Sequence, residues 1–518
     1  MRRPLGTIFG DTDLLKFRFA VTAPDILRQG DYVKVWHPTQ GWVLSQVRSI
    51  RRSSDLSFEE AKSVGTFTEV EEKVIAESVV IGARDVDGLL KSPRTPFSPG
   101  DRVFPADRDL IRETIGLGRE GIYIGLLEGH DIKVMLDPNS FVQKHCSILA
   151  KTGSGKSYTS GVIVEELLDK GVPLVIIDPH GEYVSLKFEN DGEENRAQME
   201  HYGVMPESYP DQVMVYTPAN LAVVPYADAI FRLDGINLDA RRLSLMAPTL
   251  TDTQLGLLYQ SIKTLKERMD FYRIDDIIEE VTKLKMNTKW AIVHTLELLK
   301  ETGILSDSPT PLDDLVKPGK ASIIDMKGVD PKLQEIIVSQ LASALFEARK
   351  IGKIPPLMLV IEEAHNFCPE KGIGKATSSE ILRTIASEGR KFGLGLLVIS
   401  QRPARVDKNI LSQCNTQIIL KVTNPNDLRA LSKGLEGMST DLEEEIKRIP
   451  AGMALLVSND IEKPVLVDVR VRKTRHGGES SQIVSTYPAS WEDYLDTLDV
   501  EEEVVEERGI LSRLLGRG

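Results

Sequence analysis

The sequence lacks several features that would place it in a special class of protein. No apolar run approaches the ~20 residues that span a bilayer, so we expect no membrane segment. Charged residues interleave with apolar ones over residues 1–19, which is unlike a signal peptide. Three widely spaced cysteines, Cys146, Cys368 and Cys414, fit a reducing cytosol and argue against structural zinc. The expected localisation is cytoplasmic.

A net positive charge is also missing. The chain has 64 Lys and Arg against 77 Asp and Glu, a formal net charge of −13, which taken alone speaks against a nucleic-acid partner. However, segment 181–212 has eight acids against two basic residues, and segment 491–518 has nine against three. The rest of the chain is therefore near neutral and can still present a local basic surface.

The 518 residues have an ordinary globular composition and suggest about three domains. Short alternating runs separated by glycine predict a small β-barrel at the N-terminus. From about residue 121, β-branched apolar runs alternate with helical stretches, which predicts an α/β core with a buried parallel sheet. Apolar residues at helical spacing over 250–305 predict a three- or four-helix insertion, and residues 454–471 predict a hairpin. The predicted segments are a barrel (1–110), the first part of the core (111–240), a helical-bundle insertion (241–310), the second part of the core (311–475) and an acidic tail (476–518).

The strongest motif is a phosphate-binding loop over residues 150–157, Ala-Lys-Thr-Gly-Ser-Gly-Lys-Ser. It lies between a predicted strand and a predicted helix, so backbone N–H groups at the helix N-terminus can face phosphate oxygens. Lys156 is expected to reach the β and γ phosphates of ATP, and the Ser157 hydroxyl to bind Mg²⁺. Ala150 replaces the usual first glycine, at a position that needs a small residue. The expected nucleotide-binding residues are Thr152, Gly153, Ser154, Gly155, Lys156, Ser157 and Tyr158.

Acidic residues follow two of the predicted buried strands. Glu362 and Glu363 end the apolar run from Leu357, and carboxylates at such a strand end can hold Mg²⁺ and activate the attacking water. We assign the metal role to Glu362 and the general base to Glu363; the alternative is a pair of surface acids that cap a helix. Asp178 ends an earlier strand, where it either joins the outer shell of the metal or only starts a turn.

Two further side chains suit nucleotide chemistry. Gln401 ends the apolar run over 395–399, where it could contact the γ-phosphate, although a simple turn is the alternative. Arg390 lies just before the same run, and an arginine there can project into the nucleotide of a neighbouring subunit and stabilise transition-state charge. The alternative for Arg390 is a solvated cation at a helix C-terminus.

Together these motifs resemble the HerA family of archaeal DNA translocases over nearly the whole chain. The resemblance implies a RecA-like P-loop core behind a barrel like that of ATP synthase subunits, a hexameric ring around double-stranded DNA, and ATP-driven pumping with a NurA-type nuclease in DNA-end resection. It implies nucleotide roles for Lys156, Ser157, Glu362, Glu363 and Gln401 within one subunit, and for Arg390 toward its neighbour. The pieces that carry the resemblance are Lys144-His145, residues 178–183 (Asp-Pro-His-Gly-Glu-Tyr), 362–367 (Glu-Glu-Ala-His-Asn-Phe), 388–393 (Glu-Gly-Arg-Lys-Phe-Gly) and 400–403 (Ser-Gln-Arg-Pro).

Candidate DNA contacts follow the two predicted catalytic strands, where hydrolysis could move them. Such phosphate contacts would be independent of base sequence and sensitive to salt; ordinary solvated lysines are the alternative. A conjugation or segregation pump of the same superfamily and a protein-remodelling ring ATPase are the competing functions, and the latter should ignore duplex DNA. The candidate DNA contacts are Lys371, Lys375, Arg402, Arg405 and Lys408.

Overall fold

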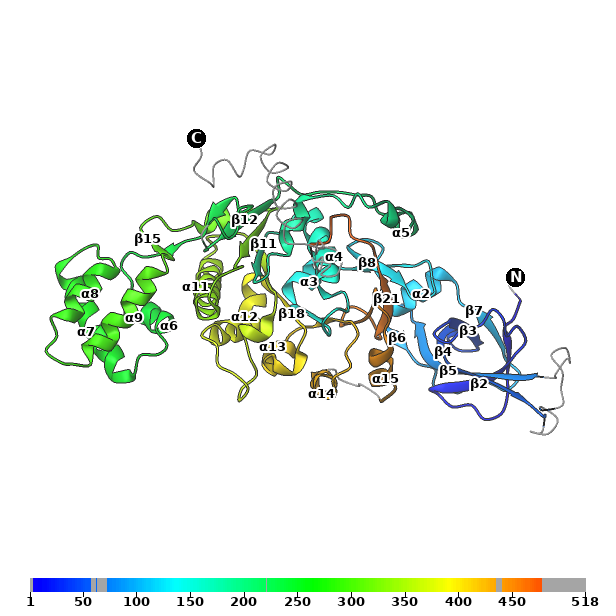
Figure 1. Cartoon of the computed structure of the whole chain (residues 1–518). Helices are drawn as coiled ribbons and strands as arrows, with labels where there is room; N and C mark the ends of the chain where they lie inside the picture. The colour runs from blue at the N-terminus through cyan, green and yellow to red at the C-terminus, as the bar shows by residue number, and fades with distance from the viewer. Residues whose placement is uncertain (1–2, 57–61, 63–71, 220, 435–439, 478–518) are drawn as a thin grey trace. The chain divides into compact units, whose positions relative to one another are not determined.

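The computed structural model of the protein describes residues 3–56, 62, 72–219, 221–434 and 440–477 (Figure 1). The chain forms two compact units, each built from several separate segments. The first unit comprises residues 1–170, 196–204 and 395–471, and the second comprises 171–195, 205–394 and 472–518. The predicted acidic tail lies outside the described residues from 478 onward.

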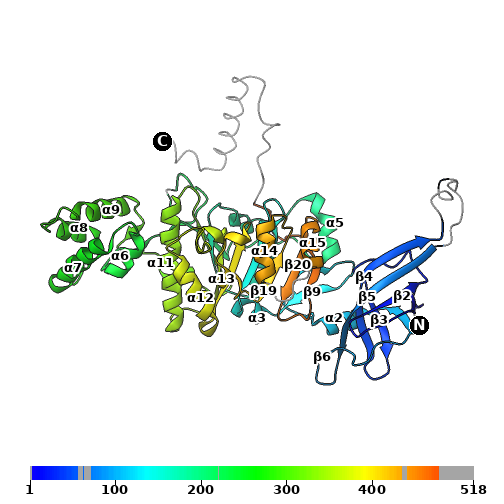
Figure 2. The ribbon, with the colours of Figure 1, turned by 90° about the horizontal axis from the view of Figure 1, so that it is seen from below.

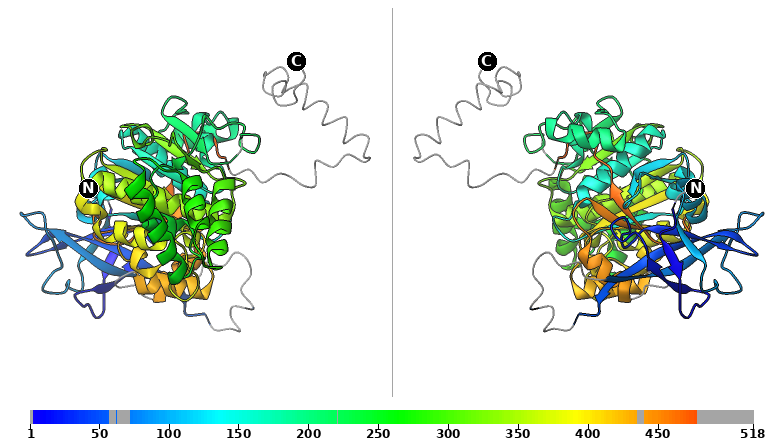
Figure 3. Two further views of the ribbon diagram at one scale, coloured as in Figure 1. Left: turned by 90° about the vertical axis from the view of Figure 1, so that its left-hand side faces the viewer. Right: turned by 90° about the vertical axis from the view of Figure 1, so that its right-hand side faces the viewer.

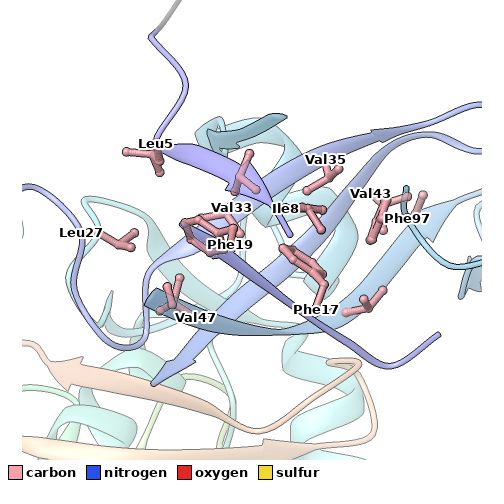
Figure 4. Packing of buried hydrophobic residues seen from close by; sticks show 14 residues of the cluster. Leu5, Ile8, Phe17, Phe19, Leu27, Val33, Val35, Val43, Val47 and Phe97 are labelled. Atoms are coloured by element: carbon pink, nitrogen blue, oxygen red, sulfur yellow. The ribbon is translucent and has the colours of Figure 1, made fainter. Parts of the chain in front are cut away.

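The N-terminal strands of the first unit close into a barrel. Its strand order is β2-β1-β7-β3-β4-β5, and pairing of β5 with β2 completes the ring. The inward side chains form one apolar core that includes Phe17, Phe19 and Val33 (Figure 4). The strands are β1 (Gly6–Ile8), β2 (Lys16–Val21), β3 (Tyr32–His37), β4 (Gly41–Ser54), β5 (Glu72–Arg84), β6 (Leu90–Lys91) and β7 (Arg102–Pro105). The predicted small barrel is confirmed.

Two barrel strands are longer than the sequence pattern indicated. The sequence predicts short runs in the barrel, whereas β4 and β5 have 14 and 13 residues. Their outer halves pair with each other from Ser49↔Glu77 to Ser54↔Glu72. Most side chains on the outer half of β4 are exposed, so this half lacks the apolar alternation on which the prediction depended.

The remainder of the first unit is a mixed sheet with helices. Its strands follow the order β18-β10-β19-β20-β21-β8-β9. β10 lies between β18 and β19 and is parallel to both, whereas β20 and β21 form the predicted antiparallel hairpin. The strands are β8 (Ile122–Leu127), β9 (Lys133–Leu136), β10 (Cys146–Leu149), β18 (Leu394–Ser400), β19 (Thr416–Ile419), β20 (Met453–Ser458) and β21 (Val465–Val469). The α-helices are α2 (Arg108–Ile115), α3 (Pro138–Gln143), α4 (Lys156–Asp169), α5 (Arg196–Tyr202), α13 (Lys408–Leu411), α14 (Pro425–Gly434) and α15 (Thr440–Arg448).

A buried ion cluster ties the hairpin to helix α4. Arg470, which follows β21, has no exposed surface. Its guanidinium donates to Glu165 Oε2 at 2.9 Å and to Glu166 Oε1 at 2.8 Å. Burial opposes the charge, but Glu165 and Glu166 outweigh it and the pKa of Arg470 is raised. The guanidinium therefore remains a cation between two buried carboxylates.

We expect Arg470→Met to destabilise the protein strongly. The substitution leaves Glu165 and Glu166 buried without their cation, and breaking a buried ion pair in this way costs about 3–5 kcal/mol. Urea and thermal unfolding measure the loss. Arg108→Met is the matched control in the same unit, because Arg108 and its partner Asp131 are both about two-thirds exposed and exposed pairs contribute little. Equal losses for the two variants would contradict the buried cluster's role.

The second unit contains a run of five neighbouring parallel strands. These strands follow the order β13-β12-β16-β11-β17, and each strand is parallel to its neighbours. The central strands are buried along their whole length, as predicted for a sheet covered on both faces. The strands are β11 (Leu174–Asp178), β12 (Val213–Thr217), β13 (Ala229–Ile230), β16 (Ala321–Asp325) and β17 (Leu357–Ile361), and the helices are α10 (Leu312–Leu315), α11 (Pro331–Lys350) and α12 (Ser379–Phe392).

The predicted helical insertion is present in the second unit. A capping box at Thr251 and Gln254 starts its longest helix. Leu258, Ile277 and Ile292 come from three different helices, and all three are fully buried. The helices lie together in Figure 2 and face the viewer in the left view of Figure 3, in green. They are α6 (Ala240–Met246), α7 (Asp252–Arg268), α8 (Ile274–Thr282) and α9 (Lys289–Glu301), between the short strands β14 (Leu233–Asp234) and β15 (Leu305–Ser306).

The predicted fold class, an α/β P-loop core with an N-terminal β-barrel and a helical insertion, is confirmed by this architecture. The domain boundaries stay a prediction. No helix among the described residues is both long and apolar enough to cross a membrane.

Candidate nucleotide-binding site

The phosphate-binding loop joins strand β10 to helix α4 in the first unit. Gly153 and Gly155 have φ angles of 74° and 91°, a left-handed conformation that glycine adopts without strain. Ser154 donates from both its amide and its hydroxyl to the Lys151 carbonyl. This turn leads directly into the first turn of α4, which begins at Lys156. Helix N-terminal amides, an ammonium and a hydroxyl are thus arranged at one point, and this donor set suits a polyphosphate.

Neighbouring strands fix the position of the loop. The Ala150 amide donates to Ser400 O at 3.2 Å, and the Lys151 amide donates to Lys421 O at 2.9 Å. Ala150 has no exposed surface, so the position accepts only a small side chain. The replacement of the usual glycine by alanine is therefore compatible with the loop.

Gln401 lies at the phosphate loop. It follows the last residue of β18, the strand next to β10. Its Oε1 accepts a hydrogen bond of 2.5 Å from the Thr152 hydroxyl. Parallel neighbouring strands end at the same edge of a sheet, which is why two residues far apart in sequence meet here. The contact with γ-phosphate proposed for Gln401 stays a prediction.

Three buried acids end neighbouring strands of the second unit. Asp178 ends β11, Asp325 ends β16, and Glu362 follows β17; none is more than 1% exposed. Asp178 and Asp325 are register partners. Parallel pairing therefore gathers three carboxylates at one sheet edge, and only two of these acids were predicted from the sequence.

Hydrogen bonds hold Asp178 and Glu362 in place. Asp178 accepts hydrogen bonds from the amides of His180, Gly181 and Tyr183 at 2.9–3.2 Å. It therefore starts a turn, which is one of the two alternatives predicted for it; the outer-shell role at the metal stays a prediction. The Tyr183 hydroxyl donates to Glu362 Oε2 at 3.0 Å. Tyr183 therefore links the turn after β11 to the acid after β17.

Asp325 has a separate partner. The Tyr226 hydroxyl donates to its Oδ2 at 2.7 Å. A Cβ on Gly181 would lie 2.6 Å from the Tyr226 hydroxyl and 2.9 Å from Asp325 Oδ2, so the turn after β11 needs glycine there. Burial, and then the charge of Asp325, raise the pKa of Asp178 to about 6, although backbone amides oppose the shift. A cation at this edge would relieve the repulsion between the two carboxylates.

Glu363 has an unusual backbone for a glutamate. Its φ angle of 49° and ψ angle of 44° are left-handed, and non-glycine residues in such regions cluster at functional sites. The side chain is 4% exposed, and its Oε2 lies 3.2 Å from His365 Nδ1. Glu363 directly precedes the short 3₁₀ helix Ala364–Asn366, but its side chain forms no capping hydrogen bond to that helix.

The donors present suit a metal bound together with nucleotide. Among the described residues, no group of three or more His, Cys, Asp or Glu side chains is placed to hold a metal ion. Mg²⁺ commonly uses one or two protein ligands plus substrate phosphates, and a serine hydroxyl and a strand-end carboxylate are each oxygen donors of that kind. The metal roles of Ser157, Glu362 and Asp178 stay a prediction.

The remaining predicted residues are exposed. Arg390 occupies the last turn of α12, which ends at the left-handed Gly393. Lys371 and Lys375 lie in the loop before α12, and Arg402, Arg405 and Lys408 follow β18. The phosphate loop, Gln401 and the last three cations belong to the first unit, whereas the acids, Arg390, Lys371 and Lys375 belong to the second.

Sequence reasoning missed Asp325, Tyr183 and Tyr226 as parts of the site. Asp325 ends an apolar β-branched run in the same way as Asp178, so the strand-end rule could have found it. No comparable signal marks the tyrosines, because their hydroxyls reach acids 99 and 179 residues away in sequence.

The fold and the phosphate loop define a P-loop ATPase, an ATP-driven enzyme. Residues 122–345 match the family described as "Helicase HerA, central domain". The resemblance predicted from the sequence is thereby confirmed. The chain is 28% identical to the DNA double-strand break repair helicase HerA of Pyrococcus furiosus, over 97% of this chain and 100% of the relative. It is 29% identical to a probable helicase of Methanocaldococcus jannaschii over 97% of each chain.

Solved structures with a similar fold include VirB4 of Thermoanaerobacter pseudethanolicus. That chain is 17% identical, with a TM-score of 0.49 over 68% of this chain and 97% of the other. The conjugative coupling protein TrwB is 14% identical, with a TM-score of 0.45 over 70% of this chain and 92% of the other.

Proposed function

We propose that the protein is a motor that uses ATP hydrolysis to translocate along or unwind double-stranded DNA during double-strand break repair. The observation that carries the proposal is the phosphate loop at the N-terminus of α4, where the Thr152 hydroxyl donates a hydrogen bond to Gln401. Relatives named as double-strand break repair helicases match 80–97% of the chain, and they supply the choice of DNA as the track.

Within one subunit, the proposed roles follow the chemistry of the side chains. Lys156 binds the β and γ phosphates, and Ser157 and Glu362 hold Mg²⁺, with Asp178 in its outer shell. Mg²⁺ supplies charge neutralisation for the phosphates. Glu363 accepts a proton from the attacking water, and Gln401 contacts the γ-phosphate.

Measuring ATPase rate with and without linear duplex DNA tests the proposal. A DNA motor should hydrolyse ATP faster when duplex DNA is present, because translocation and hydrolysis are coupled. A protein-remodelling ATPase should show the same rate in both cases. We also propose that the protein works with a NurA-type nuclease in DNA-end resection, in the cytoplasm. The same ATPase assay with the nuclease added tests this partner.

We further propose a hexameric ring in which Arg390 serves the neighbouring nucleotide. Arg390→Ala and Lys156→Ala rings should each be inactive, but mixed rings should regain hydrolysis. At a mixed interface, an intact Lys156 can face an intact Arg390, which occurs at about a quarter of interfaces in an equal random mixture. ATPase rate against mixing ratio measures the recovery.

The control for this experiment is Lys391→Ala. Lys391 is the next cation on α12 and is also exposed, so its loss should leave hydrolysis near the wild-type rate. If no mixing ratio restores hydrolysis, Arg390 acts only within its own subunit.

The proposed DNA contacts are the exposed cations Lys371, Lys375, Arg402, Arg405 and Lys408. The two groups come after strands β17 and β18, and each of these strands is directly followed by a residue assigned to ATP chemistry. Movement of those strand ends during hydrolysis would therefore be passed to the cations along the intervening chain.

A further inference from the structure

An exposed loop between Cys368 and Ser378 has firmly anchored ends. At its start, the Cys368 amide donates to Ala364 O at 2.8 Å. At its end, the Ser378 hydroxyl donates to Phe367 O at 2.6 Å, and Thr377 donates twice to Glu335 at 3.3 Å. The two ends of the loop are therefore held together at the surface of the second unit.

The loop also closes on itself, which isolates its tip. A Cβ on Gly374 would lie 3.1 Å from Pro369 Cβ, so residues 369 and 374 are in contact. Gly372 has a φ angle of 90°, and nothing lies within 4 Å of its Cβ position. The residues between the contact points therefore project into open space.

The tip has an uncommon composition, Lys-Gly-Ile-Gly-Lys over 371–375. Ile373 is 57% exposed, although burial of an isoleucine is favourable. Both lysines are exposed, and neither forms an ion pair within the part of the chain that the structure describes. A surface with an apolar centre between two unpaired cations suits a ligand with apolar surface between two anionic groups.

We propose that this 371–375 tip grips the duplex, with Ile373 packed on deoxyribose in a groove and the two lysines on flanking phosphates. The inference rests on the proposed function, because it takes DNA as the ligand. The positive charge of the two lysines favours a polyanion over a protein surface as the ligand. In DNA, the sugars between successive phosphates provide the apolar surface that Ile373 would contact. Apolar side chains, isoleucine among them, enter the minor groove in other DNA-binding proteins. Ile373 is thus assigned a DNA contact in addition to the lysines.

Salt dependence separates the two kinds of contact. Ile373→Thr should weaken duplex binding roughly tenfold at every salt concentration, because it removes apolar contact but no charge. The slope of log affinity against log salt should not change. Lys371→Gln combined with Lys375→Gln should instead flatten the slope, since each lost phosphate contact reduces it by about 0.9.

Two variants serve as matched controls. Ile373→Val keeps the branched shape and apolar surface, so it should bind nearly as well as wild type, whereas threonine has the same shape with a hydroxyl. Ile351→Thr tests position, because Ile351 is 77% exposed and lies next to Lys350 at the end of α11. It should not change DNA binding.

Thiol footprinting provides a direct readout. All three native cysteines are buried, so Ile373→Cys and Ile351→Cys each add one accessible thiol. Saturating duplex DNA should slow maleimide modification at position 373 and not at position 351. Light scattering on each variant checks that assembly is unchanged.

The proposal is overturned if Ile373→Thr binds duplex DNA like wild type, if Ile351→Thr weakens binding equally, or if the loss follows only from altered assembly. It is also overturned if DNA leaves the thiol at 373 unprotected. Failure of the wild-type protein to bind duplex DNA at all would instead reject the proposed function, so the two failures are distinct.

Discussion

Replacement of Lys156 by alanine should lower ATP hydrolysis at least about a hundredfold, which is the scale of removing one charged group that stabilises transferring phosphate. Lys156 is the first residue of α4, directly after the left-handed Gly155. The backbone donors of the loop would remain, so the fold should persist and nucleotide affinity should fall less than turnover. Steady-state hydrolysis and thermal unfolding, measured on the same preparation, separate these effects.

Lys151→Ala is the control within the same loop. The Lys151 side chain is exposed, and the contacts that shape the loop come from its backbone: its amide donates to Lys421, and its carbonyl accepts from Ser154. Hydrolysis should therefore stay close to the wild-type rate. Undiminished turnover in purified Lys156→Ala protein would reject the assignment of the loop.

Glu363→Gln should bind ATP but hydrolyse it about 10²–10⁴-fold more slowly, the range expected for loss of a general base. The amide keeps the shape of the side chain but cannot accept the proton of water. The left-handed conformation at Glu363 belongs to the backbone path, so the turn should remain. Single-turnover hydrolysis and nucleotide binding, measured in parallel, check the result.

Glu362→Gln distinguishes the two acids. Glu362 is fully buried and accepts a hydrogen bond from the Tyr183 hydroxyl. Because we propose it as a metal ligand, its replacement should lower the affinity for Mg²⁺ before it lowers the rate at saturating Mg²⁺. If Glu362→Gln were the slower enzyme and had normal affinity for the metal, the base and the metal ligand would have to exchange roles.

The parts of the site that could be predicted depend on local patterns. The phosphate loop needs glycines at fixed offsets between a strand and a helix, and the chain presents them within eight residues. Strand ends could be predicted for the same reason, since β-branched runs stop at Asp178, Glu362 and Gln401. Residue type and spacing along the chain carry this information.

The parts that could not be predicted depend on pairing between distant residues. Arg470 follows an alternating strand, and nothing near it in sequence indicates that its partners are Glu165 and Glu166, about 300 residues earlier. The link from Tyr226 to Asp325 is of the same kind. Such contacts are set by strand order and by the register of parallel strands, which a single sequence does not encode locally.

The division of the chain between two units has a consequence for its biosynthesis. Strand β10 needs β18 and β19 on its two sides, yet the chain between 170 and 395 belongs almost entirely to the other unit. A ribosome that adds roughly 5–20 residues per second needs on the order of 10–45 s to make those 224 residues. Throughout that interval the nascent chain presents an apolar strand with two open edges, a state prone to aggregation. The protein should therefore depend on chaperones during synthesis more than its folded stability would suggest.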